Sequence, residues 1–142
     1  PCFATPYEFQ YGKADLIRGG KDAAIITTGG MVYRAIEAWR KLKEKGMEVQ
    51  VLNISCLSDL DIYAILKAAN TGRVITYEDH HIQTGLGSLI ANVIAEHGLP
   101  ARLRKMGITR YGSSGKPDDL YRMQGLNVDS LVQAVLDEVE RI

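Results

Sequence analysis

Residues 73–90 read R-V-I-T-Y-E-D-H-H-I-Q-T-G-L-G-S-L-I, and this stretch joins a strand-like segment to a helix-like one. The apolar run 74–77 predicts a buried strand, and Gly85 and Gly87 open an amphipathic helix. Between the two segments stand four ionisable residues in a row, Glu78, Asp79, His80 and His81. Because functional sites in α/β proteins collect at the carboxyl ends of strands, this cluster is the first candidate site.

The same alternation of strand and helix continues on both sides of this stretch. Apolar, β-branched runs predict strands over residues 23–28, 49–54, 73–77 and 101–108, with a further edge strand over 12–18. Apolar residues at helical spacing predict a helix over 31–45, and further helices are expected over 84–97 and, started by Pro117, over 116–123. Asp59 or Asp61 is expected to cap a helix that runs to about residue 69, and Asn127 or Asp129 to cap a final helix that runs to residue 142. Such alternation defines an α/β fold, in which helices cover both faces of a mostly parallel sheet.

Length and composition exclude several classes of protein. The chain has 142 residues, which suits one domain with a sizeable core. Its 17 basic residues balance 17 acidic ones, which argues against a nucleic-acid partner and against membrane binding through bulk charge. No apolar run approaches the roughly 20 residues that span a bilayer. The chain has only two cysteines, Cys2 and Cys56, which indicates a reducing compartment, so we expect the cytoplasm. No metal site is predicted, because no cysteine or histidine lies at a recognised metal-ligand spacing.

The ionisable cluster has two interpretations. A histidine beside carboxylates can act as an acid or a base, with Glu78 or Asp79 as its partner. Adjacent residues of an extended segment point in opposite directions, however, so at most one of His80 and His81 shares a face with a given carboxylate. Because no nucleophile is nearby, we favour the second interpretation, in which the cluster satisfies backbone amides and pairs across an interface. No catalytic residue is predicted.

Two glycine pairs resemble anion-binding turns. Gly29 and Gly30 in T-T-G-G-M follow an expected strand, and amides at the start of a helix can hold an anion. The segment matches neither G-x-G-x-x-G nor a Walker motif. Gly85 and Gly87 form G-x-G, with Ile90 in place of the third glycine. For both pairs, a tight turn with close approach of helix and strand is the favoured interpretation.

A third candidate is Y-G-S-S-G-K-P, residues 111–117, in which Ser114, Gly115 and Lys116 precede a proline. These residues form either a phosphate-binding turn or a surface loop before a helix that starts at the proline. One alternative function is therefore a freestanding regulatory module. It would bind a nucleotide or other anion through Gly29, Gly30 and residues 112–116.

Four sequence blocks occur together in a fixed order, namely Y-E-F-Q-Y-G-K-A-D-L-I-R-G-G-K-D-A-A-I-I-T-T-G-G, V-L-N-I-S-C-L-S-D-L-D, V-I-T-Y-E-D-H-H-I-Q-T-G-L-G-S and S-G-K-P-D-D-L-Y-R-M-Q-G-L. With them the chain closely resembles, over residues 7–142, the C-terminal domain of transketolase, a thiamine-diphosphate-dependent enzyme. The order and spacing of E-D-H-x-x-x-x-G-L-G and S-G-K-P make the resemblance fairly specific. Ser58 departs from the family, which often has lysine and proline before the Leu-Asp pair.

The resemblance implies a five-stranded mixed sheet with one antiparallel strand. Residues 1–10 carry two prolines and no periodicity, so we expect them to be a linker or the tail of a preceding domain, and residues 11–142 to form the C-terminal domain. In the family this domain serves dimerisation and domain packing in an enzyme that transfers two-carbon ketol groups between sugar phosphates. The cluster Glu78 to His81 would then be an interface element.

The implied partners are the N-terminal and middle domains of the same enzyme and a second copy of the chain, as a homo-oligomer. Thiamine diphosphate and Mg²⁺ lie between those other domains in the family, so this chain alone is expected to bind no cofactor. A related alternative is the β-subunit domain of a 2-oxoacid dehydrogenase. The block S-G-K-P-D-D-L favours transketolase over that alternative.

Overall fold

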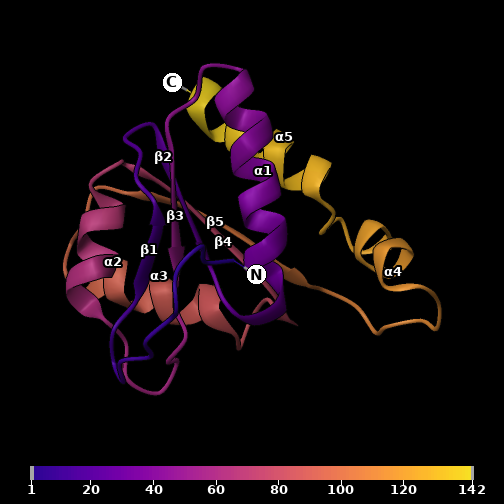
Figure 1. The fold of residues 1–142 in the computed structure, drawn as a ribbon, viewed down its shortest axis with the longest axis horizontal. Coiled ribbons are helices and arrows are strands. Elements are labelled where there is room, and N and C mark those ends of the chain that lie inside the picture. Colours follow the sequence, from indigo (N-terminus) through magenta and orange to yellow (C-terminus); the bar gives the residue numbers. More distant parts are fainter. Residues whose placement is uncertain (1, 142) are drawn as a thin grey trace.

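The computed structural model describes residues 2–141, which form one five-stranded sheet with helices on both faces (Figure 1). The spatial order of the strands is β1-β3-β2-β4-β5. At one edge β1 is antiparallel to β3, and the other neighbours are parallel. The predicted mixed sheet with one antiparallel edge strand is therefore confirmed. The strands are β1 (Asp15–Arg18), β2 (Ala23–Thr27), β3 (Val49–Asn53), β4 (Arg73–His81) and β5 (Arg102–Ile108).

The expected helices are all present. They are α1 (Val32–Glu44), preceded by a 3₁₀ turn η1 (Gly29–Met31), α2 (Ile62–Ala69), α3 (Leu86–Glu96), α4 (Pro117–Met123) and α5 (Val128–Glu140). Of the two acidic residues offered as the cap of α2, Asp61 takes the position, and its side chain accepts from Ala64 N at 3.1 Å. Asn127 stands at the N-cap position of α5.

Two hydrophobic cores lie on opposite faces of the sheet, because alternate residues of a strand point to opposite sides. Ile25 and Ile75 join the core beneath α1 and α5. Their sequence neighbours Ile26 and Val74 join the core beneath α2 and α3. Since both faces are covered, β2 is buried along its whole length, which explains why residues 23–26 form an apolar run rather than an alternating pattern.

Strand β4 is longer than the apolar pattern predicts. It was expected to end at Tyr77, but it continues to His81, with an irregular register between these two residues. The backbone pairing with β5 sustains it, since His81 is paired with Ile108 and the amide of Ile82 donates to Ile108 O at 2.9 Å. The ionisable cluster thus forms the last part of the strand rather than the loop that follows it.

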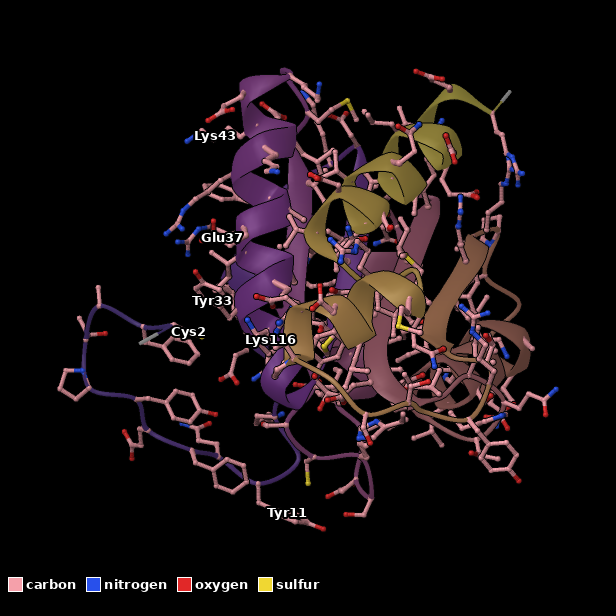
Figure 2. The ribbon with its side chains drawn as sticks, turned by 90° about the vertical axis from the view of Figure 1, so that its right-hand side faces the viewer. Cys2, Tyr11, Tyr33, Glu37, Lys43 and Lys116 are labelled. Carbon is pink, nitrogen blue, oxygen red and sulfur yellow. The ribbon has the colours of Figure 1, made fainter. Side chains whose placement is uncertain are left out.

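The N-terminal segment lies outside the body of the domain. Figure 2 shows it as an extended trace between Cys2 and Tyr11, and it contains neither helix nor strand over residues 2–10. The proposed boundary between this segment and the domain that starts at residue 11 stays a prediction. Within residues 2–141, every helix is too short or too polar to cross a membrane.

Tyr77 is the largest fully buried side chain at the centre of the sheet, and its hydroxyl donates to Leu126 O just before α5. Tyr77→Phe keeps the ring but leaves this buried carbonyl without its donor. We expect the free energy of unfolding at neutral pH to fall by about 1–2 kcal/mol. Urea denaturation followed by circular dichroism measures the difference.

The same substitution should also change how stability depends on pH. Burial raises the pKa of Tyr77 above its ordinary value. The unfolded chain releases this proton near pH 10, about the pKa of free tyrosine, whereas the folded chain retains it to higher pH. The contribution of Tyr77 to stability is therefore complete below that pH and is lost above it. Tyr77→Phe should lose less stability than the wild type in alkali, and equal losses would contradict this account.

Candidate functional site

Glu78, the first residue of the ionisable cluster, is a fully buried carboxylate. Its Oε2 accepts from the amide of Leu86 at 2.6 Å, and its Oε1 accepts from the amide of Gly87 at 2.9 Å. These amides belong to the first turn of α3, where backbone donors lack partners within the helix. The N-cap residue of α3 is Gly85, which has no side chain to supply an acceptor. Glu78 therefore caps α3 from the neighbouring strand.

Gly85 and Gly87 make this contact possible. A Cβ atom on Gly85 would lie 2.1 Å from Glu78 Oε2, and one on Gly87 would lie 2.7 Å from Thr76 Oγ1. Both glycines thus permit the close approach of helix and strand that the sequence favoured. Anion binding at these two glycines stays a prediction, and the carboxylate of Glu78 occupies the place at the helix start that an external anion would take.

The two histidines of the cluster have different surroundings. His80 Nδ1 lies 3.2 Å from Glu78 Oε2, and its Nε2 lies 3.8 Å from Asp79 Oδ1. The side chain of His81 instead accepts from the amide of Gln83 at 3.2 Å. As the alternation along a strand predicts, only His80 reaches Glu78. The geometry is that of a helix cap supported by a half-exposed histidine.

Asp79 belongs to a different feature, a pocket of about 680 Å³ between the ends of β4 and β5 and helix α4. The sequence did not predict this pocket. Ile108, the last residue of β5, lines it, and most of the wall comes from the chain after β5, including Tyr111, Leu120, Tyr121, Met123 and Gln124. The pocket brings Asp79 together with part of the 111–117 segment. Ser114, Gly115 and Lys116 are exposed and stand outside the wall.

Helix α4 and the loop before it form an arm that stands away from the sheet (Figure 1). We call residues 109–125 the α4 arm. Every residue of α4 is at least partly exposed. Arg34 of α1 contacts the arm twice, since its Nη2 lies 2.7 Å from Asp118 Oδ1 and its guanidinium stacks 4.2 Å from the centre of the Tyr121 ring. Tyr121 also packs against the core on that face of the sheet. Cation–π contacts and exposed ion pairs of this kind are individually weak.

The other anion candidate, at Gly29 and Gly30, lies beside a separate hollow. This hollow is lined by Gly29, Asn53 and Ser55 together with aromatic residues of the N-terminal segment. Of residues 112–116, Gly112 and Ser113 line the first pocket instead. The structure therefore separates the two halves of the anion site that the sequence suggested. Within residues 2–141, no three His, Cys, Asp or Glu side chains are grouped so that they could hold a metal ion.

The fold and the site define a single α/β domain with a mixed sheet, in which the buried Glu78 carboxylate near the end of β4 joins this strand to α3. Comparison with known protein families identifies the family to which this domain belongs. The model of the transketolase C-terminal domain matches residues 12–131, and the chain belongs to that family. The resemblance drawn from the sequence blocks is thereby confirmed.

Individual relatives agree with this assignment. The chain is 38% identical over 133 residues to one of the subunits of the apulose-4-phosphate transketolase of Actinobacillus succinogenes, covering 92% of this chain and 43% of that protein. It is 35% identical to a putative transketolase C-terminal section of Methanocaldococcus jannaschii, covering 94% and 42%. A solved split-gene transketolase, described as an inactive beta4 tetramer, superimposes with a TM-score of 0.91 at 28% identity, covering 98% and 46%. The chain thus spans less than half the length of these relatives.

Proposed function

We propose that this chain is the C-terminal, largely non-catalytic part of a transketolase-like enzyme that transfers two-carbon ketol groups between sugar phosphates. The family match supports the reaction, and the observation that carries the non-catalytic role is the position of Glu78. The Glu78 carboxylate accepts hydrogen bonds from two amides at the start of α3, and it has no exposed surface with which to contact a substrate. Asp79, His80 and His81 lie at the surface beside it, where they are suited to contacts with another domain.

We further propose that thiamine diphosphate and Mg²⁺ are held by the remainder of the complete enzyme. The chain covers less than half the length of the relatives it matches, so the rest of such an enzyme offers the place for the cofactor. The contribution of this chain to the reaction would then be to hold the cofactor-binding domains in place.

The proposed partners are the N-terminal and middle domains, on the same or a separate polypeptide, and a second copy of this chain. Two lines support them. Relatives that match almost the whole chain are named as a transketolase subunit or as a C-terminal section. The split-gene transketolase with the same fold is described as a tetramer of its beta chains, which supports self-association here.

We propose a reducing, cytoplasmic location for the chain. Cys2 and Cys56 are free rather than joined in a disulfide, which supports it.

A reconstitution assay tests this function. Transketolase activity would be measured with thiamine diphosphate and Mg²⁺ for the chain alone, for the N-terminal and middle domains alone, and for the combination. We expect activity in the combination only. The double variant His80→Ala, His81→Ala should keep turnover within about threefold of wild type, since surface contacts contribute little to the chemical step. Activity from the chain alone, or loss of turnover in an intact oligomer of the double variant, would contradict the proposal.

A further inference from the structure

The pocket between β5 and α4 is large enough to receive side chains from another molecule. Its volume is about 680 Å³, and apolar groups such as Ile108, Leu120 and Met123 form much of its wall. Met123 remains 54% exposed. A concave, mostly apolar surface with a few polar groups is the usual form of a binding site.

The polar groups of the pocket indicate what kind of side chain would enter. Gln124 forms part of the wall, and its Oε1 is buried without a hydrogen-bond partner among residues 2–141. Its amide nitrogen is already used, since Nε2 donates to Arg110 O at 3.2 Å. Asp79 offers a second acceptor, with only long contacts of its own: the hydroxyl of Tyr121 lies 3.5 Å from its Oδ2, and His80 Nε2 lies 3.8 Å from its Oδ1. The pocket therefore suits an apolar body that carries a hydrogen-bond donor.

Tyr111 is such a group, and it stands at the rim of the same pocket. Its side chain is fully exposed, at 102% of the reference area, so it does not fill the pocket of its own chain. A tyrosine combines a large apolar ring with a hydroxyl that finds a partner when buried. We propose that Tyr111 of each chain enters this pocket on a second copy, in a reciprocal contact about a twofold axis.

The composition of the patch agrees with a twofold contact, in which the same surface is used by both copies. The α4 arm carries tyrosine, methionine and arginine, which are enriched in protein interfaces. Arg110 and Asp79 place one positive and one negative group beside the same pocket, an arrangement that a twofold axis can pair between copies. The inference rests on the self-association proposed above and adds the surface that performs it.

Sedimentation velocity on the full chain over a range of concentrations provides the first test. We expect a reversible dimer for wild type. Tyr111→Ser should raise its dissociation constant roughly tenfold or more, as removal of a central interface tyrosine does. Tyr111→Phe, which keeps the ring without the hydroxyl, should give an intermediate value. The matched control is Tyr63→Ser on α2, a tyrosine that is 68% exposed and remote from the pocket, which should leave the constant unchanged.

A mixing experiment distinguishes reciprocal insertion from any other contact made by the arm. Leu120→Glu places a charge in the pocket wall but leaves Tyr111 intact. Neither Tyr111→Ser nor Leu120→Glu should dimerise well alone. Their mixture should form heterodimers, because the tyrosine of the second variant enters the intact pocket of the first. Circular dichroism checks that each variant is folded.

Two results would overturn the inference. One is a wild-type chain that stays monomeric at every concentration. The other is dimerisation that Tyr111→Ser does not weaken or that mixing does not restore. The reconstitution assay described above tests the proposed function and does not depend on this surface. Activity that reconstitutes while Tyr111→Ser dimerises normally would refute this surface and leave the proposed function standing.

Discussion

Replacing Glu78 with alanine should lower the free energy of unfolding by roughly 3–5 kcal/mol. Two backbone donors of α3 would lose a carboxylate acceptor inside the protein, and water would not reach them easily because Glu78 is fully buried. Hydrogen bonds to charged groups contribute more than neutral ones, and unsatisfied buried donors add a cost of their own. The effect should therefore exceed that of an ordinary helix cap, which contributes about 1 kcal/mol.

Urea denaturation monitored by circular dichroism measures this change, with two reference variants. Asp79→Ala removes the neighbouring carboxylate, which caps no helix, and should cost about 0.5 kcal/mol or less. Glu78→Gln keeps the length of the side chain and one oxygen acceptor, so its loss should be intermediate. A loss below about 1 kcal/mol for Glu78→Ala would show that α3 starts equally well without this carboxylate.

Gly20→Ala should be comparably damaging, for a steric reason. A Cβ atom at this position would lie 2.4 Å from Val49 C and 2.5 Å from Glu48 O, both of them backbone atoms at the start of β3. Backbone cannot rotate out of the way as a flexible side chain can. The turn before β2 would have to withdraw and weaken the hydrogen bonds that Lys21 N and Asp22 N donate to Glu48 O, both at 2.9 Å. We expect a loss of roughly 3 kcal/mol.

Gly19→Ala is the matched control, because it adds the same methyl group one residue earlier. A Cβ atom at Gly19 meets no heavy atom of residues 2–141 within 4 Å, and its backbone is outside the positive-φ region. The control should be within about 0.5 kcal/mol of wild type or slightly more stable, since alanine restricts the unfolded chain. Thermal denaturation of the pair measures both values. Equal melting temperatures for Gly20→Ala and Gly19→Ala would contradict this prediction, because they would show that the turn accommodates the added methyl group without loss of stability.

Most of the fold follows from the sequence because the apolar periodicities are strong. Strand β2 and helix α1 show it best, one as a continuous apolar run and the other as an amphipathic stripe. The extension of β4 to His81 could not be predicted in this way. It depends on backbone pairing with β5, which is independent of whether side chains are apolar.

The sequence pointed to the ionisable cluster at residues 78–81 but not to the contacts that its side chains make. A glycine at the N-cap position of α3 was the available signal that the cap comes from elsewhere, and the buried carboxylate of Glu78 supplies it. The pocket beside the α4 arm could not be predicted from the sequence. Asp79 and Tyr111 come to line the same pocket only when β4 and β5 pair side by side. Local pattern carries no information about such contacts.

The cap that Glu78 provides also bears on the order in which the chain folds. A helix with its own capping residue can begin to form before its surroundings exist, whereas the capping group of α3 arrives with β4. The two elements are only eight residues apart at this contact, so closing the loop between them costs little entropy. Strand, turn and helix thus form one cooperative local unit, and α3 reaches its full stability when β4 takes its place in the sheet.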